Sequence, residues 1–392
     1  MSNTQKKNVP ELRFPGFEGE WEEKKLESII KVNSGKDYKH LDKGDIPVYG
    51  TGGYMTSVSE PLSEIDAVGI GRKGTINKPY LLEAPFWTVD TLFYCTPKKE
   101  TDILFILSLF RKINWKVYDE STGVPSLSKQ TINKINRFVP TNKEQQKIGK
   151  FFSKLDRQIE LQEQKLELLQ QQKKGYIQKI FSQELRFKDE NGNDYPEWEN
   201  VMLQKVLKDK TEGIKRGPFG GALKKDIFVE SGYAVYEQRN AIYDISNFRY
   251  YINENKYKEM QSFSVQPNDI IMSCSGTIGR LALIPHNYTK GIINQALIRF
   301  RTNHKIRSEF FLIFMRSNQM QRKILEANPG SAITNLVPVK ELKLIPFPLP
   351  VKFEQDKISQ FIHIINRRIE QSEKKIESLK NRKQGFLQKL FV

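Results

Sequence analysis

Residues 144–181 read EQQKIGKFFSKLDRQIELQEQKLELLQQQKKGYIQKIF, and residues 354–391 read EQDKISQFIHIINRRIEQSEKKIESLKNRKQGFLQKLF. The second segment repeats the first 210 positions later, with residue 354 standing where residue 144 does. Identical residues recur along the whole length, as far as Phe181 and Phe391. Chance does not produce such a match, so the chain contains an internal repeat.

Shorter matches extend the repeat toward the N-terminus. Residues 11–14 and 184–187 both read ELRF, Trp21 corresponds to Trp198, and both 74–76 and 276–278 read GTI. The offset between matching residues grows along the chain, so the second copy has longer loops in its globular part. We therefore expect two copies of one module, each a globular part followed by a helix, with boundaries at 1–142, 143–182, 183–351 and 352–392.

Within each repeated segment the apolar residues follow steps of four and three, which is the heptad pattern of a coiled-coil seam. A parallel pair in register would set Lys173 against Lys383 inside the seam, where like charges repel and are poorly solvated. The two segments are therefore expected to pair antiparallel, each helix being about 50 Å long at 1.5 Å per residue. The expected seam residues are Ile148, Phe152, Leu155, Ile159, Leu166, Leu169, Ile358, Ile362, Ile365, Ile369, Ile376 and Leu379.

The globular parts show short apolar runs broken by glycine and proline turns, which indicate strands. Strands are expected at 46–49, 67–70, 270–273 and 292–300, and helices at 103–113 and 310–324. The predicted fold class is α+β: two domains of mixed strand and helix content, joined by two long helices that form an antiparallel coiled coil.

The composition favours a polyanionic partner. The 392 residues include 63 Lys and Arg against 46 Asp and Glu, a net charge of +17, which points to nucleic acid before a membrane surface. The two cysteines, Cys95 and Cys274, are too far apart for a disulfide framework or a metal site, which suggests a reducing cytoplasm. We expect neither a signal peptide nor a membrane span, since no apolar run approaches roughly 18 residues.

Several loops mix glycine with basic and aromatic residues in both globular parts. Glycine lets the backbone approach phosphates, while Arg, Gln and Asn can read base edges. For any single loop, a solvated surface turn is an equally good interpretation, but the accumulation in both modules favours DNA. The candidate DNA-binding residues are Lys36, Tyr38, Lys39, His40, Tyr54, Arg72, Lys73, Lys215, Arg216, Phe219, Lys224, Gln238, Arg239, Asn240, Thr277 and Arg280.

Motifs for catalysis are weak. Residues 69–74 fit a dinucleotide-binding glycine pattern, but the sequence that follows is no helix start. No phosphate-binding loop ending in Gly-Lys-Ser/Thr is present, and the four histidines lack metal-ligand spacing. Residues 77–80, NKPY, imitate the base-gripping loop of DNA methyltransferases only poorly. We therefore expect a DNA reader that is not an enzyme and holds no cofactor or metal.

Taken together, these features resemble the specificity subunit of bacterial type I restriction-modification systems. The residues that carry the resemblance are FVP at 138–140 before EQQKI, PFPLP at 346–350 before EQDKI, and the helix ends at Phe181 and Phe391. The resemblance covers essentially the whole chain.

The resemblance implies that each target-recognition domain reads one half of a split, asymmetric site in double-stranded DNA, and that the helices fix the spacer. It also implies two methyltransferase subunits, which modify adenine with S-adenosylmethionine, and two restriction subunits, which move and cut DNA with ATP and magnesium. These cofactors would belong to the partner subunits, and the complex would serve in phage defence.

Two other functions are left open by the residues alone. A coiled-coil adaptor could use the basic loops to bind acidic proteins, and it would show no preference for a bipartite DNA sequence. An autonomous nuclease would cleave DNA by itself with a metal ion, and we expect no such activity.

Overall fold

The computed structural model describes residues 8–209, 212–327 and 334–392. The chain forms two compact units: the first comprises Met1–Leu166 and Gln371–Val392, and the second comprises Glu167–Glu370. The two long helices, α4 (Asn142–Phe181) and α10 (Lys352–Lys389), each contribute one part to both units. No helix in the described ranges has the length and apolar character of a membrane span.

The first unit contains two sheets. The chain passes from one to the other between β7 (Trp87–Thr88) and β8 (Leu92–Pro97). The four-stranded sheet is antiparallel, while in the three-stranded sheet β3 pairs in parallel with β7. The first sheet has the order β2 (Ile30–Ser34), β8 (Leu92–Pro97), β5 (Ala67–Gly71), β6 (Tyr80–Leu82), and the second has the order β4 (Gly53–Val58), β3 (Ile46–Gly50), β7 (Trp87–Thr88). Besides its parts of α4 and α10, the unit contains a two-stranded ribbon and shorter helices: β1 (Glu22–Lys25) with β9 (Asn136–Val139), α1 (Leu26–Ile29), α2 (Ile103–Lys112), a 3-10 helix (Trp115–Tyr118) and α3 (Lys129–Lys134).

The core of the first unit gathers aromatic side chains from distant parts of the chain. Helix α2 begins at the N-cap Asp102, whose side chain accepts a hydrogen bond of 2.8 Å from the backbone N–H of Phe105. Phe105 stacks on Phe391 at 5.6 Å between ring centroids, and Trp21 meets both rings edge-on. The C-terminal end of α10 is therefore part of this core.

The second unit has the same plan with additional elements. Its sheets have the orders β11 (Ile214–Arg216), β18 (Leu297–Phe300), β15 (Ile270–Ser273), β16 (Leu281–Leu283) and β12 (Phe228–Val229), β14 (Tyr251–Ile252), β13 (Tyr233–Tyr236), β17 (Gly291–Ile293). Two ribbons pair β10 (Glu199–Met202) with β21 (Pro346–Leu349) and β19 (Leu325–Ala327) with β20 (Thr334–Leu336). The shorter helices are α5 (Gln238–Tyr243), α6 (Glu254–Glu259), α7 (Ser308–Met315), α8 (Asn318–Ile324) and α9 (Val339–Leu342).

The topology shows that the duplication extends beyond the helices. The order β2-β8-β5-β6 recurs as β11-β18-β15-β16, and the parallel pair of β3 with β7 recurs as β13 with β17. Phe310 of α7 packs on Phe181 and Trp198, just as Phe105 of α2 packs on Phe391 and Trp21. The two globular parts are thus copies of one α+β fold, although their sequences have diverged.

Two of the predicted elements are each divided into two in the structure, so their predicted continuity is wrong. The strand expected at 292–300 is interrupted between β17 and β18 by a turn, in which the side-chain oxygen of Asn294 accepts a hydrogen bond from the N–H of Ala296. The helix expected at 310–324 is divided into α7 and α8, because Ser317 caps the N-terminus of α8 by accepting a hydrogen bond from the N–H of Met320. The strands expected at 46–49, 67–70 and 270–273 and the helix expected at 103–113 are confirmed to within a residue.

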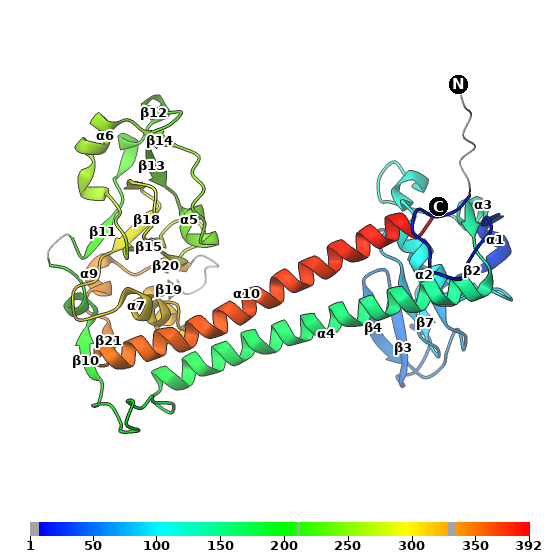
Figure 1. The fold of residues 1–392 in the computed structure, drawn as a ribbon, viewed down its shortest axis with the longest axis horizontal. Helices are drawn as coiled ribbons and strands as arrows, with labels where there is room; N and C mark the ends of the chain where they lie inside the picture. Colours follow the sequence, from blue (N-terminus) through cyan, green and yellow to red (C-terminus); the bar gives the residue numbers. More distant parts are fainter. Residues whose placement is uncertain (1–7, 210–211, 328–333) are drawn as a thin grey trace. The chain divides into compact units, whose positions relative to one another are not determined.

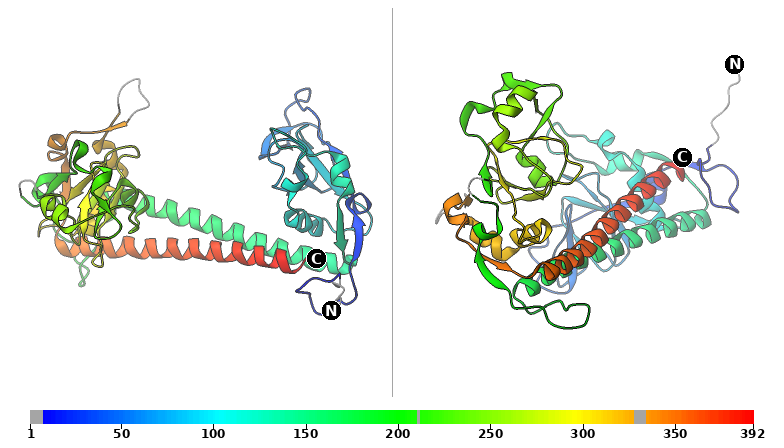
Figure 2. Two further views of the ribbon diagram at one scale, coloured as in Figure 1. Left: turned by 90° about the horizontal axis from the view of Figure 1, so that it is seen from above. Right: turned by 60° about the vertical axis from the view of Figure 1, so that its left-hand side comes forward.

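Helices α4 and α10 pack side by side and antiparallel, which confirms the predicted orientation (Figures 1 and 2). In the first unit, the Gln162 side-chain amide donates to the Ser372 hydroxyl at 2.7 Å. In the second unit, Tyr176 packs edge-on against Phe361 at 5.1 Å. The predicted seam residues are buried, except that Leu166, Leu169 and Ile369 are half-buried.

The repeated sequence motifs anchor each globular part to the start of a long helix. In the first unit, Glu144 is 1% exposed and accepts two hydrogen bonds from Arg13, at 2.8 and 2.7 Å. In the second unit, Glu354 is 0% exposed and accepts 2.8 and 3.0 Å bonds from Arg186, with a third of 2.8 Å from the Trp198 indole. The glutamate of EQQKI or EQDKI and the arginine of ELRF thus form one buried ion pair per unit.

Candidate nucleic-acid interface

In the first unit, the basic loops converge on the connection between β7 and β8. The backbone N–H of Lys36 donates to Thr88 at 2.8 Å, and that of Arg72 donates to Thr91 at 2.8 Å. The β3–β4 hairpin joins them, because Tyr49 accepts a hydrogen bond from the N–H of Val89. We call this surface, made of residues 35–40, 49–54, 71–74 and 88–91, the first recognition edge.

Glycine is required where two loops of the first recognition edge meet. A Cβ on Gly35 would lie 2.0 Å from the carbonyl oxygen of Val89, so only glycine lets the two loops approach this closely. Gly74, the first residue of the repeated GTI, has φ +88°, and Gly276 at the same place in the second copy has φ +62°. The repeated motif therefore marks a left-handed turn in both copies.

The candidate residues of the first recognition edge are exposed, with Tyr38 half-buried. The guanidinium of Arg72 lies over the ring of Phe93, a residue of β8, at 5.9 Å from the ring centroid. His40 contacts Trp87 edge-on at 5.9 Å, and Tyr54 is 64% exposed. The structure thus brings Lys36, Lys39, His40, Tyr54, Arg72 and Lys73 to loops that contact one connection.

The second unit has an equivalent edge around the turn between β17 and β18. The N–H of Gly217 donates to Leu297 at 2.9 Å, and the N–H of Cys274 donates to Ala296 at 2.9 Å. A Cβ on Gly217 would lie 1.8 Å from the carbonyl oxygen of Asn294, as Gly35 lies against Val89 in the first unit. We call residues 215–219, 236–240, 274–280 and 294–296 the second recognition edge.

The candidates of the second unit differ in how accessible they are. Phe219 is 79% exposed beneath the guanidinium of Arg216, at 5.7 Å, and Lys224, Thr277 and Arg280 are also exposed. Lys215 is half-buried, with its ammonium 4.8 Å from the centre of the Phe263 ring. Gln238 and Arg239 are half-buried on the first turn of α5.

Gln238 has an unusual environment for a polar side chain. Its Oε1 is buried and accepts no hydrogen bond from the residues that the structure describes. It lies beside Gly276, where a Cβ would be 3.3 Å from that oxygen. Because buried polar groups normally find partners, this oxygen is an exception within the second recognition edge.

Asn240, also predicted to bind DNA, differs from the other candidates because it is buried and its polar atoms bond within the protein. The residue is 2% exposed, and its side-chain oxygen accepts a hydrogen bond of 2.8 Å from the N–H of Glu237, completing a capping box on α5. Its amide nitrogen donates to Ile245 and Asn247 at 2.8 and 3.1 Å. With these bonds made inside the protein, the side chain serves the local fold.

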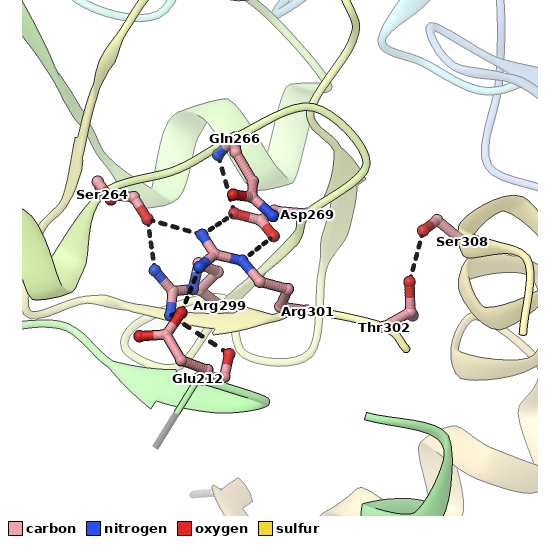
Figure 3. Close-up of polar contacts among 8 residues, drawn as sticks. All are labelled: Glu212, Ser264, Gln266, Asp269, Arg299, Arg301, Thr302 and Ser308. Carbon is pink, nitrogen blue, oxygen red and sulfur yellow. Dashed lines mark hydrogen bonds and ion pairs between the residues drawn. The ribbon is translucent and has the colours of Figure 1, made fainter. Parts of the chain in front are cut away.

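Two buried arginines form an ion-pair cluster in the second unit, at the end of β15 and β18 away from the second recognition edge, and the sequence analysis does not predict them. Arg299 and Arg301 lie on or directly after β18, where Asp269 accepts 2.8 Å bonds from both Nε and Nη2 of Arg301 (Figure 3). Glu212 pairs with both guanidinium groups, and Ser264 accepts from them through its carbonyl oxygen. Burial lowers the pKa of Arg299 from its ordinary value. The signal in the sequence was an acid at the start of one apolar strand and two arginines on another.

The exposed cations among the candidate residues of both units contrast with this buried cluster. Arg299 and Arg301 are neutralised by neighbouring carboxylates, and Arg249 pairs with Glu237 at 2.6 Å. None of the following exposed cations forms an ion pair with another residue of the described ranges: Lys36, Lys39, Arg72, Lys73, Arg216, Lys224 and Arg280. Their charge is available to an external polyanion such as the DNA backbone.

Comparison with known proteins agrees with this arrangement. Residues 18–171 and 220–381 match the family model of the type I restriction modification DNA specificity domain. The type I restriction enzyme MjaVIII specificity subunit of Methanocaldococcus jannaschii is 23% identical over 349 residues, covering 84% of this chain and 76% of the relative.

Solved structures share the fold. The S subunit of a type I restriction-modification system from M. genitalium superposes with a TM-score of 0.62 at 15% identity, covering 98% of this chain and 99% of that one. A chain from a structure on complex assembly and conformational transition of the type I R-M system superposes with a TM-score of 0.57 at 14% identity, covering 94% and 97%. With two matches to the family model, one in each copy of the module, the chain belongs to the type I restriction-modification specificity family, as the non-catalytic subunit that determines DNA target recognition.

Proposed function

We propose that each unit reads one half of a bipartite site in double-stranded DNA through its recognition edge. The observation that carries this proposal is the convergence of exposed cations and aromatic rings on one connection in each unit, joined in the second unit by the amide side chain of Gln238. Lysine and arginine hold phosphates, while arginine and glutamine read base edges in the major groove.

The two half-sites are proposed to differ in sequence. The loop after β2 reads GKDYKH from Gly35, whereas the loop after β11 reads GPFGG from Gly217, so the two edges present different side chains. A protein that had two identical edges would read a palindrome. Divergent edges on a duplicated fold therefore favour an asymmetric target.

The helix pair is proposed to set the spacer between the half-sites. Helix α4 has 40 residues and α10 has 38, so each is roughly 60 Å long at 1.5 Å per residue. Buried apolar residues hold the seam along both helices, and this makes the pair stiff enough to define a distance.

The chemistry is proposed to lie in partner subunits. In this proposal two methyltransferase subunits use S-adenosylmethionine to methylate adenine, and two restriction subunits use ATP and magnesium to translocate and cut DNA. The specificity subunit itself holds no cofactor, and the complex works in the cytoplasm. Support comes from the family match and from the likeness to a chain of an assembled type I R-M system.

The test is binding of a random duplex library to the chain purified with its cognate methyltransferase subunit, at several salt concentrations. We expect enrichment of two short sequences separated by a fixed spacer, with specificity that persists as salt weakens the overall affinity. Enrichment of no sequence, with binding to acidic proteins instead, would support the adaptor and refute the proposal.

A paired deletion tests the spacer. Removing residues 159–165 and 369–375, which are centred on the facing pair Gln162 and Ser372, takes one equivalent heptad from each helix, about 10 Å of rise or roughly three base pairs. The selected spacer should shorten while both half-sequences stay the same. A change in the half-sequences with an unchanged spacer would refute the proposed role of the helices.

A further inference from the structure

A loop between the 3-10 helix and α3 closes on itself in the first unit. Ser126 joins its two ends, because its N–H donates to the Asp119 carboxylate at 2.9 Å and its carbonyl oxygen accepts from the N–H of Glu120 at 3.0 Å. The same oxygen of Asp119 accepts from the N–H and the hydroxyl of Ser121, at 3.0 and 2.9 Å. One carboxylate oxygen thus ties together the ends of residues 119–126, which we call the closed loop.

The closed loop is attached to the basic turn of the first recognition edge. The N–H of Gly74 donates to the carbonyl oxygen of Pro125 at 2.8 Å, and the N–H of Leu127 donates to that of Arg72 at 2.9 Å. Between these two bonds, Lys73 forms an antiparallel bridge with the last residue of the closed loop. The closed loop therefore adds a further segment to the first recognition edge, directly beside two of its cations.

Val124 is an exposed apolar residue of the closed loop. Its exposed fraction is 67%. On Gly123 and on Gly74, no atom of the described residues lies within 4 Å of the place where a Cβ would stand, so this part of the junction faces open space. A single exposed valine is common on protein surfaces. Here, however, a carboxylate holds the loop that presents the valine, and the loop is bonded to a basic turn.

Three exposed cations lie at the same junction. The Arg72 guanidinium and the Lys129 ammonium are 5.9 and 6.0 Å from the centroid of the Phe93 ring, and Lys73 lies between Arg72 and the glycine that bonds to the loop. Lysine and arginine hold DNA phosphates, while apolar side chains contact the C5 methyl group that distinguishes thymine in the major groove. The junction therefore combines charge for the DNA backbone with one apolar group for a base.

We propose that Val124 is a specificity-determining residue of the first unit, which contacts the methyl group of a thymine in one half-site. Asp119 is its positioning residue, because it holds the closed loop that presents Val124. The inference rests on the proposed function, in which each unit reads half of a DNA site through its recognition edge. A loop that is tied before binding loses less conformational entropy when it meets a base, and this favours discrimination by a small contact.

The test compares thymine with uracil in duplexes that carry the selected bipartite site. Uracil lacks only the C5 methyl group, so replacing each thymine of both half-sites in turn removes one methyl contact at a time. For the chain purified with its cognate methyltransferase subunit, uracil at one position should weaken binding about fourfold, which corresponds to the burial of one methyl group. For Val124→Ser, uracil and thymine at that position should bind equally well.

Matched variants serve as controls. Val117, on the 3-10 helix, is 72% exposed, and Val117→Ser should discriminate between thymine and uracil as the unaltered chain does. Asp119→Ala removes the acceptor of the closed loop and should abolish the discrimination, whereas Asp119→Asn keeps one oxygen for the three donors and should retain it. The other positions of that half-site, and the whole of the other half-site, should be selected unchanged in every variant, which a general loss of structure would not allow.

The outcomes separate this inference from the proposed function. If the unaltered chain selects a bipartite site but no thymine in it is sensitive to loss of its methyl group, or if Val124→Ser still discriminates, the inference is overturned and the proposed function stands. Equal weakening of all sequences by Val124→Ser would make the residue a backbone contact, and weaker binding of the methyltransferase alone would make it a protein contact; either result is against the inference. If the unaltered chain selects no sequence, the proposed function fails, and the inference with it.

Discussion

The buried ion pairs that anchor the helices allow a prediction with an internal control. Glu354 accepts hydrogen bonds from Arg186 and from the Trp198 indole, whereas Glu144 accepts them from Arg13 alone. The indole N–H of Trp21, at the position equivalent to Trp198, is buried and has no acceptor among the described residues. The two anchors thus differ by one hydrogen bond.

Replacing either glutamate with glutamine removes the negative charge. It also sets the amide N–H of the glutamine against the N–H groups of the arginine, which can only donate. For Glu354→Gln we expect the second unit to lose about 3 kcal/mol, the low end for breaking a buried pair, because Arg186 remains 22% exposed. For Glu144→Gln the loss in the first unit should be smaller by about 1 kcal/mol, the net worth of one hydrogen bond.

Native-state hydrogen exchange measures each anchor separately, which a single unfolding curve of a two-unit protein does not. The readout is the free energy of opening for amides in the first turns of α10 in Glu354→Gln and of α4 in Glu144→Gln. Equal losses, or a larger loss at Glu144, would refute the reasoning that the Trp198 bond strengthens the second anchor. Exchange that rises in the unmutated anchor as well would show that the units do not open independently.

Three further predictions concern the second unit. Asp269→Asn should destabilise this unit by about 3–5 kcal/mol, measured by native-state hydrogen exchange of amides in β15 and β18, since it leaves buried guanidinium groups underpaired, while Glu212→Gln, at a side chain 51% exposed, should cost clearly less. Gly217→Ala should abolish selection of one half-site in the library assay and spare the other, because its Cβ would overlap the carbonyl oxygen of Asn294; loss of both half-sites would contradict this. Arg239→Ala should relax that same half-site by about 1–3 kcal/mol if the side chain reads a base, and uniform weakening across all sequences would mark it as a phosphate contact.

The sequence predicts the helical half of the molecule well because the relevant interactions are periodic. Heptad spacing identified the buried seam, and the two lysines at equivalent places excluded a parallel pair. In the structure Lys383 is paired with Asp156, an arrangement that the antiparallel orientation makes possible. The repeat also identified Glu144 and Glu354, although their role as buried anchors needed the fold to bring Arg13 and Arg186 to them.

The recognition edges were less predictable because they depend on contacts between distant loops. Gly35 meets Val89, and Gly217 meets Asn294, and no local pattern announces either approach. Asn240 is of a residue type that can read bases, yet it is buried where it caps α5. Residue types suggested which loops to consider, while tertiary structure decided which side chains remained accessible.

The hydrogen bond between Gln162 and Ser372 bears on the origin of the chain. These residues are 210 positions apart, which is the offset of the repeat, so each is the other's counterpart in the two copies. A residue that meets its own equivalent is the signature of a two-fold axis in a homodimer. A chain of half this length that paired with itself would bring the same two positions together across its axis, so in this chain the contact joins the two copies of one repeated position.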